Sequence, residues 1–371
     1  MKIAQLINCI GAGGSGTLVY NLSMDLVKNG HSVDIILLNS FTGESFELNT
    51  LRKLRKAGVG TFELRRNPGY NLDLPGVIAR FFRLQRRNRY DVIHSHSHVC
   101  HFFVGLLKRF VLFQHLITVH SSRERWTTLT QFFCKDANIA CCSEAAANGT
   151  VKIRKPLVIN NGVKFESPNL TAGKEPSQLR QELGIPLTTK LILGVGNLRK
   201  EKNYGLALRT IEKLVSMSTA HEYHYAICGD GPERAKLESL SRQLCITKYV
   251  SFLGIRSDIP NLLYISDCFL STSEFEGLPM AVLEAFASGI CCVLSPIPEH
   301  VDISADIECC CLSTSMEPLA FALAIISSTE KDINKLDVRE KRNSQLQKFS
   351  WEHCLLAYEE LYKNQMVNET I

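Results

Sequence analysis

The chain has 371 residues, 45% hydrophobic and 21% charged, a composition typical of a soluble globular protein large enough for two domains. It starts directly with an apolar strand pattern and contains no apolar run long enough to span a membrane, so we expect a cytoplasmic protein. Its fourteen cysteines include no Cys-x-x-Cys spacing. This argues against zinc-ribbon and thioredoxin-like proteins and favours buried thiols in a reducing compartment.

Charge is distributed unevenly along the sequence, although the formal net charge is only +5. Residues 1–165 contain 22 Lys and Arg against 10 Asp and Glu, whereas residues 166–371 contain 20 against 27. The first half is therefore expected to face an anionic partner.

The first predicted unit is strand, glycine loop, helix and strand, over residues 2–9, 10–17, 18–28 and 32–38. Gly11, Gly13 and Gly16 have the spacing of the dinucleotide-binding fingerprint, so an NAD(P)-dependent enzyme is one alternative. That fingerprint also requires an acidic residue after the second strand, where this chain has Asn39 and Ser40. The missing acidic residue argues against the NAD(P) alternative.

Residues 77–89 form a basic helical segment. Arg80, Arg83 and Arg87 share one face at spacings of three and four residues, with apolar side chains between them. An ordinary solvated helix face has the same pattern. The functional alternative is a surface for anionic lipid headgroups or a lipid diphosphate, which would hold the protein peripherally at the inner face of the cell membrane.

Two further strands of the first half end in histidines. His94, His96 and His98 alternate along one predicted strand, and such a pattern could place them on one face as a zinc site. The alternative is that they line the end of the strand without a metal. His120 follows the apolar run 116–119 and is expected at the end of the next strand.

The second half restarts the strand–helix alternation after a polar segment, 164–189, which we interpret as a linker. A strand at 191–196 leads through Asn197 to the basic loop that ends in Lys202, a composition that suits phosphate. The next strands end at Gly229 and Gly254, and the last helix begins near Trp351.

Residues 271–295 are predicted to form strand end, loop, helix and strand. Pro279 stands where a first helical turn could begin and Gly289 where the helix could end. Glu276 and Glu284 flank the helix start, beside free backbone amides. Carboxylates repel phosphate but accept hydrogen bonds from hydroxyls, so the pair favours a sugar or ribose ligand, although glutamate is also simply favourable at a helix start.

This stretch resembles the Glu-x7-Glu signature of the retaining GT-B glycosyltransferases of family 4, and Glu276 and Glu284 occupy its two glutamate positions. The resemblance extends in motif order over almost the whole chain. It implies an α/β fold of the GT-B type, with two Rossmann-like domains facing a cleft. The expected domains are residues 1–165 with 350–371 on the acceptor side and 166–349 for the nucleotide sugar, with the C-terminal helix crossing back.

The resemblance also assigns roles to residues. It implies that His120, Glu276 and Lys202 are catalytic and that Glu284 holds the ribose. The full donor-binding set implied in this way comprises Gly13, Gly14, Asn197, Lys202, Gly229, Gly254, Ile255, Glu276, Gly277, Leu278, Pro279 and Glu284. Asn197 replaces the arginine of the family pattern, and Ser15, Gly16 and Thr17 stand where many members have a glutamate after the glycine loop.

The implied reaction transfers a sugar, with retention, from a UDP- or GDP-linked donor to a glycan or lipid-linked acceptor. It needs no metal and no cofactor, and the setting is bacterial surface-polysaccharide synthesis, with no nucleic-acid partner. A glycoside hydrolase would also use two carboxylates, but no hydrolase pattern surrounds them. A non-catalytic nucleotide-sugar-binding or scaffold protein of the same fold is the remaining alternative, favoured by Asn197 alone.

Overall fold

The chain, represented by a computed structural model, divides into two compact units, Met1–Gly162 with Glu352–Ile371, and Val163–Trp351. The structure describes residues 1–11, 13–43, 45–67, 73–121, 123–124, 126–149, 156–164, 176–217, 221–305, 307, 309–330, 337–338, 341–342 and 345–367. Each unit is built around one parallel sheet, and we call them unit 1 and unit 2 in chain order.

Unit 1 contains a seven-stranded sheet with the order β3-β2-β1-β4-β5-β6-β7. Its strands are β1 (Lys2–Ile7), β2 (Ser32–Asn39), β3 (Gly60–Arg66), β4 (Val92–Ser95), β5 (Gln114–Val119), β6 (Asn138–Cys141) and β7 (Leu157–Val158). All of these pairings are parallel, so the carboxyl ends of the strands lie along one edge of the sheet.

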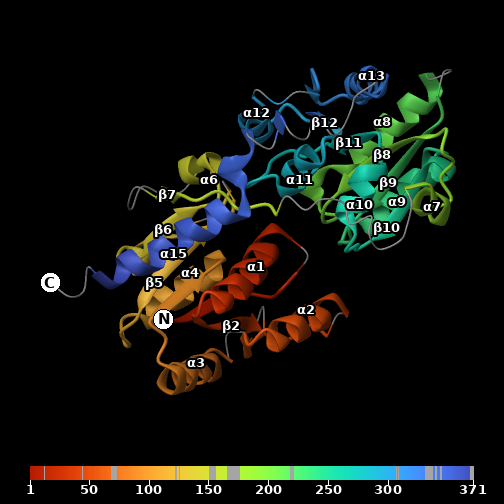
Figure 1. Ribbon diagram of the computed structural model, residues 1–371. Helices are drawn as coiled ribbons and strands as arrows, with labels where there is room; N and C mark the ends of the chain where they lie inside the picture. Colours follow the sequence, from red (N-terminus) through yellow and green to blue (C-terminus); the bar gives the residue numbers. More distant parts are fainter. Residues whose placement is uncertain are drawn as a thin grey trace. The chain divides into compact units, whose positions relative to one another are not determined.

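Helices pack on both faces of this sheet (Figure 1). They are α1 (Gly14–Lys28), α2 (Ser45–Lys56), α3 (Leu74–Asn88), α4 (His98–Leu107), α5 (Thr128–Cys134), α6 (Glu144–Gly149) and α15 (Trp351–Val367). Alternation along β2 explains the two layers, because successive side chains of a strand point to opposite faces. Ile35 and Leu37 pack in one buried cluster, with residues of α1 and α2, whereas Ile36 and Leu38 pack in the other, with residues of α3 and α4.

Helix α15 returns the C-terminal end of the chain to unit 1 from Glu352 onward. Its Tyr358 and Tyr362 are fully buried, and their hydroxyl groups bond to polar side chains of β1, β4 and β5. Unit 1 is therefore completed by a segment that follows unit 2 in sequence.

Unit 2 contains a six-stranded parallel sheet with the order β10-β9-β8-β11-β12-β13. The strands are β8 (Lys190–Val195), β9 (Tyr223–Cys228), β10 (Val250–Gly254), β11 (Cys268–Ser271), β12 (Cys291–Leu294) and β13 (Cys310–Leu312). The α-helices are α7 (Pro176–Glu182), α8 (Tyr204–Met217), α9 (Arg234–Gln243), α10 (Ile259–Ile265), α11 (Met280–Ser288), α12 (Pro298–Ser304) and α13 (Pro318–Thr329). Short 3-10 helices are η2 (Lys200–Lys202), η3 (Thr247–Tyr249) and η4 (Gln347–Phe349).

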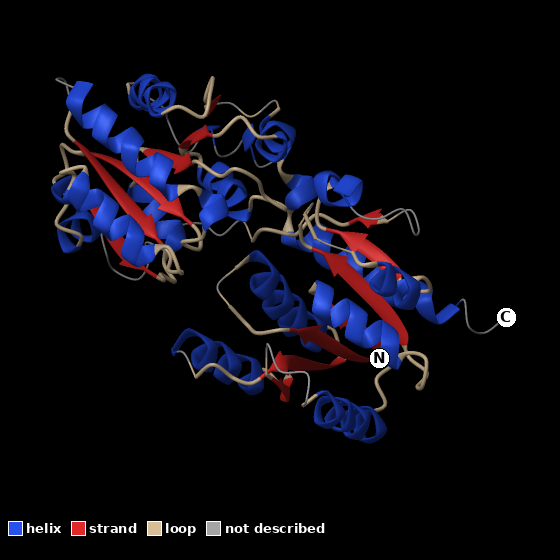
Figure 2. Cartoon of the chain, turned by 180° about the vertical axis from the view of Figure 1, so that it is seen from behind, coloured by secondary structure: helices blue, strands red, loops and turns tan. Residues whose placement is uncertain are grey.

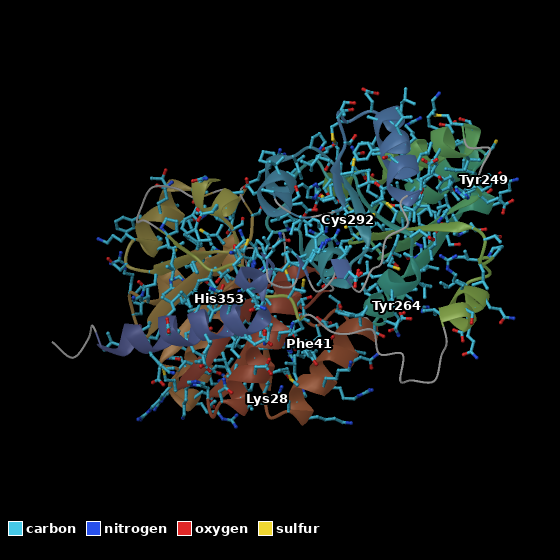
Figure 3. The ribbon with its side chains drawn as sticks, turned by 45° about the horizontal axis from the view of Figure 1, so that its top comes forward. Lys28, Phe41, Tyr249, Tyr264, Cys292 and His353 are labelled. Carbon is cyan, nitrogen blue, oxygen red and sulfur yellow. The ribbon has the colours of Figure 1, made fainter. Side chains whose placement is uncertain are left out.

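The helices of unit 2 also cover both faces of its sheet, as the view from behind shows (Figure 2). Ile211 of α8 and Phe321 of α13 are fully buried in one cluster with residues of β8, β9 and β11. The fourteen cysteines are all free, and most of them are buried, like Cys292 among the packed side chains of β12 (Figure 3). The prediction of buried thiols is confirmed for nine of them, whereas Cys9 and Cys245 are exposed and Cys309, Cys310 and Cys311 are half-buried. Burial raises the pKa of the Cys292 thiol well above its ordinary value.

Two expectations from the sequence need correction. Helix α1 begins at Gly14 rather than near residue 18, because the glycines form its first turn instead of a loop before it. Part of the predicted linker is helix α7, which packs on unit 2: Leu179 is buried, and the Arg180 guanidinium donates to the carbonyls of Thr189 and Ile265. Residues 165–175 of that linker lie outside the described residues.

Candidate active site

The stretch singled out in the sequence folds as strand, loop, helix and strand, as predicted. Strand β11 ends at Ser271, helix α11 begins at Met280 after Pro279, and Gly289 ends the helix with a φ of 80°. A left-handed residue at this position favours glycine, which has no Cβ to clash. The loop 272–279 therefore lies at the carboxyl edge of the sheet, beside the amino end of a helix, where open α/β sheets bind ligands.

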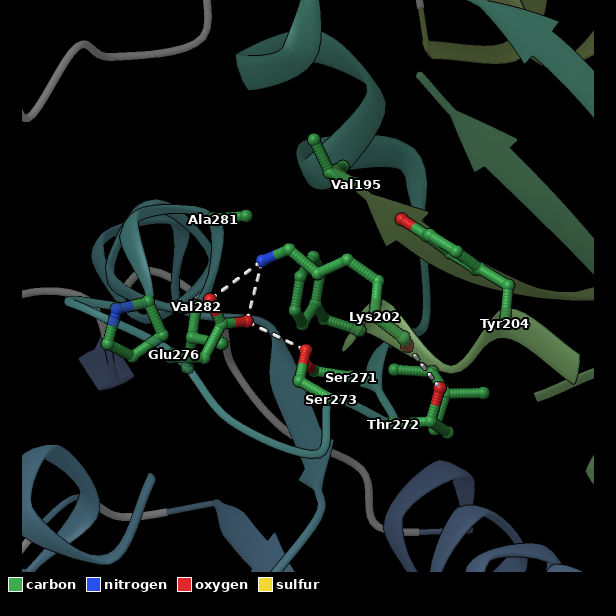
Figure 4. Close-up of a pocket in the computed structure, with 12 residues that line it drawn as sticks. Val195, Lys202, Tyr204, Ser271, Thr272, Ser273, Glu276, Ala281 and Val282 are labelled. Atoms are coloured by element: carbon green, nitrogen blue, oxygen red, sulfur yellow. Dashed lines mark hydrogen bonds and ion pairs between the residues drawn. The ribbon is translucent and has the colours of Figure 1, made fainter. Parts of the chain in front are cut away.

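An ion pair between Lys202 and Glu276 forms the centre of this loop region (Figure 4). Lys202 Nζ lies 2.6 Å from Oε1 and 2.8 Å from Oε2 of Glu276, so the ammonium group bridges both carboxylate oxygens. The Ser273 hydroxyl donates to Oε1 at 2.7 Å. The Glu276 side chain is 9% exposed and that of Lys202 is 25% exposed. A ligand can therefore reach the lysine while the carboxylate stays held.

Backbone and hydroxyl contacts fix the two loops that carry this pair. The Thr272 hydroxyl lies 3.1 Å from the carbonyl oxygen of Lys202 and 3.0 Å from that of Asn203. The Glu274 amide donates to the Glu201 carbonyl at 2.9 Å. Because β8 and β11 are neighbours in the sheet, these contacts tie the loop after β8 to the loop after β11. The cavity between them has a volume of about 20 Å³, space for a single water molecule.

Three glycines hold the neighbouring strand ends close together. The Gly196 amide donates to the Cys228 carbonyl, and the Gly229 amide donates to the Gly254 carbonyl at 2.7 Å. Gly229 has a φ of 146°, and a Cβ there would lie 1.9 Å from the Gly196 carbonyl oxygen. Ile255, directly after β10, is 47% exposed and presents an apolar side chain at this edge.

The structure brings only part of the expected donor-binding set together. Lys202, Glu276 and Pro279 line the small cavity. Asn197 lies in the loop after β8, and Glu284 lies partly buried on α11, beyond the helix start. The remaining predicted residues lie in the loop before α11 or at the ends of β9 and β10, on the same sheet edge but outside this cavity, and they are Gly229, Gly254, Ile255, Gly277 and Leu278.

His300 belongs to the surroundings of this site and was missed by sequence reasoning. Its Nδ1 lies 3.0 Å from the Ser295 carbonyl oxygen, so Nδ1 carries the proton and donates. Its Nε2 is buried and has no hydrogen-bond partner in the described part of the chain. Burial lowers the pKa of His300, and the Glu276 carboxylate partly opposes this. The only sequence signal was a lone histidine after Pro298-Glu299, which is too general to assign a role.

The glycine loop of unit 1 forms the start of helix α1. Gly13 is the N-cap residue, without a side-chain cap, and Gly14 is the first helical residue. The Thr17 amide donates to the Gly13 carbonyl at 3.0 Å, so the amides before it are available to a ligand at the positive end of the helix. A Cβ at Gly16 would lie 2.2 Å from the Gly11 carbonyl oxygen, which explains why this position requires glycine.

His120 lies directly after β5, at the carboxyl edge of the sheet of unit 1. Its Nε2 is 3.2 Å from Nδ1 of His96, and Nε2 of His96 is 2.6 Å from Oε1 of Gln5. Burial lowers the pKa of His120 to about 4, so the ring is neutral near pH 7. The contact with Gln5 had no signal in the sequence, because Gln5 lies in the middle of an apolar strand.

The three alternating histidines do not converge on one strand face. His94 is fully buried in β4 and bonds to Tyr362 and Thr118, whereas His98 is the first residue of α4 and bonds to Thr130. Within the described ranges, no group of three or more His, Cys, Asp or Glu residues could hold a metal ion.

A second histidine cluster joins the end of strand β4 to helix α4. Ser95 Oγ is 2.8 Å from Nδ1 of His101, and Nε2 of His101 is 3.0 Å from Oε1 of Glu124. This is the order of a serine–histidine–acid triad, but Ser95 is completely buried, so no substrate can reach its hydroxyl. The cluster is therefore a structural network.

Comparison with known proteins agrees with this geometry. Residues 12–167 match the family described as Glycosyltransferase Family 4, and residues 176–346 match Glycosyl transferases group 1. The chain is 25% identical to N-acetyl-alpha-D-glucosaminyl L-malate synthase of Bacillus anthracis, over 98% of this chain and 97% of that protein. It is 23% identical to the O-antigen biosynthesis glycosyltransferase WclY of Escherichia coli, over 98% of each chain.

A similar fold occurs in the crystal structure of Anabaena HepE in complex with UDP and glucose. The TM-score is 0.80 at 17% identity, with 98% of this chain and 100% of that chain covered. The two parallel-sheet units and the family matches thus define a glycosyltransferase with the GT-B fold. The chain belongs to glycosyltransferase family 4 and is an enzyme that transfers glycosyl groups.

The arginine helix of unit 1 is α3, and its exposed face differs from the predicted one. Arg80 is turned toward the unit itself, where its Nε donates to the Leu64 carbonyl at 2.7 Å. Arg83, Arg86 and Arg87 are exposed, and together with Phe82 they line one open hollow on the surface of α3. No helix in the described part of the chain is both long enough and apolar enough to cross a membrane.

Proposed function

We propose that this enzyme transfers a sugar, with retention at the anomeric carbon, from a nucleotide-diphosphate sugar to a glycan or lipid-linked acceptor. The observation that carries the proposal is the bridged pair of Lys202 and Glu276, held with Ser273 at the carboxyl edge of the sheet of unit 2. It offers a cation and a hydrogen-bond acceptor side by side, which are the groups that a diphosphate and a sugar ring require.

In this proposal Lys202 offsets the negative charge that grows on the diphosphate as it leaves. Such an interaction strengthens in the transition state, and a group held in place beforehand needs no reorganisation. The Gly13 and Gly14 amides, at the start of helix α1, would also stabilise the negative charge of the diphosphate. Asn197 supplies no charge, so Lys202 would provide most of the positive charge from the loop after β8.

The remaining residues would bind the neutral parts of the donor. Glu276, with the Leu278 amide, would orient the sugar hydroxyls, and Glu284 would accept from the ribose. Gly254 and the exposed Ile255 would frame a uracil or guanine base. His120 would hydrogen-bond the sugar from unit 1. The proposed reaction proceeds by attack of the acceptor on the face that the diphosphate leaves, and it needs no metal ion.

The test is donor binding and turnover by matched variants. UDP and GDP, with their common sugar conjugates, are first screened by thermal shift with and without EDTA. A ligand at 100 times its Kd stabilises by about 2.7 kcal/mol. Glu276→Gln and Lys202→Met should each lower kcat by at least about a hundredfold. Glu274→Gln, an exposed carboxylate in the same loop, is the control and should retain activity.

Two results would contradict the proposal. A chain that binds the nucleotide sugar but never turns it over would be the scaffold protein that Asn197 favours. Thermal stabilisation of the protein by NADH alone would instead support the alternative that the glycine loop binds a dinucleotide.

For the acceptor, we propose a lipid-linked glycan at an anionic membrane surface, in the synthesis of a bacterial surface polysaccharide. The support is WclY among the relatives and the exposed face of α3, where Arg83, Arg86 and Arg87 line one hollow with Phe82. Each cation near an anionic surface contributes about 1 kcal/mol, and an aromatic ring adds apolar contact.

Flotation with anionic liposomes tests this surface. Replacement of Arg83, Arg86 and Arg87 by Ser should abolish co-flotation. The control replaces Arg52, Lys53 and Lys56, which are exposed on α2 of the same unit, and removes the same charge. Equal loss in both variants would mean that net charge alone, rather than this face, drives binding. No flotation of the wild type would remove the membrane from the proposal.

A further inference from the structure

A continuous chain of buried hydrogen bonds joins helix α15 to His120 within unit 1. A side branch outside the path to His120 leads from His94 Nε2 to Thr118 Oγ1 at 2.7 Å and from there to the Tyr358 hydroxyl at 2.9 Å. His94 Nδ1 lies 2.7 Å from the Tyr362 hydroxyl, to which the Gln5 amide donates at 3.0 Å. The Gln5 side-chain oxygen then forms a hydrogen bond with Nε2 of His96, and Nδ1 of His96 forms one with Nε2 of His120.

The direction of these hydrogen bonds follows from the donors and acceptors available. The Gln5 side-chain oxygen can only accept, so the proton of neutral His96 must be on Nε2. His96 Nδ1 is then a bare acceptor, and the 3.2 Å contact requires a proton on Nε2 of His120. Burial lowers the pKa values of His96 and His120, so both rings are neutral and each carries one proton.

Tyr362 holds the Gln5 amide in the orientation that this direction needs. The tyrosine oxygen accepts from the Gln5 nitrogen, while its own proton is donated to Nδ1 of His94. If the hydroxyl were absent, the amide could turn over and donate to His96 instead of accepting from it. The proton positions on His96 and His120 would then reverse.

One atom at the end of the chain has no partner. Nδ1 of His120 makes no hydrogen bond to any described residue. Unlike the completely buried Ser95, His120 is only partly buried at the edge of the sheet, so a ligand can approach this side chain. With the proton on Nε2, this atom is an acceptor, and a buried acceptor left unpaired is unfavourable. A hydroxyl group of a bound sugar would satisfy it.

We propose that Gln5, His96 and Tyr362 are positioning residues that hold His120 in its Nε2-protonated form, so that His120 Nδ1 accepts a hydrogen bond from a substrate hydroxyl. The proposal rests on the proposed function for the identity of the substrate, and otherwise on the geometry of unit 1. It assigns His120 the role of an acceptor that orients the sugar, rather than a proton donor, and it makes α15 part of the site.

The test measures the proton position on His120 directly. Protein labelled with ¹⁵N-histidine is compared as wild type, Tyr362→Phe and Tyr358→Phe, with His120→Gln used to assign the signals. Wild type and Tyr358→Phe should show His120 protonated at Nε2, whereas Tyr362→Phe should show protonation at Nδ1 in a large share of molecules. Each tyrosine variant removes one buried hydroxyl from the same helix, so a general loss of packing affects both.

Activity gives the second measurement. Tyr362→Phe should lower kcat about tenfold and change the donor KM by less than about twofold. In the Tyr358→Phe enzyme, both kcat and the donor KM should change by less than about twofold. If Tyr362→Phe does not fold, His96→Leu and His96→Asn replace it, because Asn keeps an acceptor toward His120 and Leu does not. Protonation of wild-type His120 at Nδ1 would overturn the inference. An inactive wild type with Nε2 protonation would instead contradict the proposed function only.

Discussion

At the scale of single residues, Lys202 and Glu276 should contribute unequally to stability. Glu276 is nearly buried, so Lys202→Met would remove the cation from its carboxylate and leave only the Ser273 hydroxyl, at a cost of about 3 kcal/mol. Lys202 is 25% exposed and can be solvated, so Glu276→Gln should cost only about 1 kcal/mol. Urea unfolding of both variants and of the double variant measures the difference. If the double variant is destabilised by the sum of the two single-variant effects, the two side chains do not interact.

The same residues show how far the sequence predicts the site. Glu276 and Lys202 were predicted because they stand in a long, specific pattern. Ser273 and His300 were not predicted, because a hydroxyl or a lone ring close to a motif can point in several directions, and only the folded loop determines its partner. Side-chain partners far apart in sequence, such as Gln5 and Tyr362, leave no local pattern at all.

At the scale of elements, the start of helix α1 should tolerate alanine at one glycine and not at another. A Cβ at Gly16 would meet the Gly11 carbonyl oxygen, whereas a Cβ at Gly11 has no atom within 4 Å. Gly16→Ala should therefore destabilise unit 1 by about 1–3 kcal/mol and reduce donor turnover. Gly11→Ala should change stability by less than about 0.5 kcal/mol. Thermal unfolding and turnover are measured for both variants. Equal effects would contradict the close approach of residue 16 to the Gly11 carbonyl oxygen.

Element boundaries were predicted well where the chain has one dominant constraint. Strand β11, helix α11 and the left-handed Gly289 agree with the prediction because apolar runs and glycine leave few alternatives. The start of α1 and the whole of α7 were missed. Glycines are poor helix formers, and α7 is stabilised by the tertiary contacts of Leu179 and Arg180, which local propensity does not contain.

At the scale of the whole molecule, the two units differ in how many of their histidines have a lowered pKa. Six histidines of unit 1 have lowered pKa values, chiefly through burial, against two in unit 2. They are His31, His94, His96, His98, His115 and His120 in unit 1, and His224 and His300 in unit 2. A histidine with a lowered pKa binds its proton more readily in the unfolded chain, so acid favours unfolding.

Unit 1 should therefore unfold before unit 2 as the pH falls. The stability linked to these histidines is fully present above about pH 6.5 and is lost as the pH falls toward their folded-state pKa values, about 4 for His120. The two tryptophans report the units separately, because Trp126 stacks on His101 in unit 1 and Trp351 lies against Lys164 in unit 2. Urea unfolding is followed by fluorescence at pH 7.5 and at pH 5, in Trp351→Phe, which retains Trp126, and in Trp126→Phe, which retains Trp351. The free energy of unfolding reported by Trp126 should fall more between the two pH values than that reported by Trp351. Equal losses would mean that the histidines with lowered pKa values do not control acid stability.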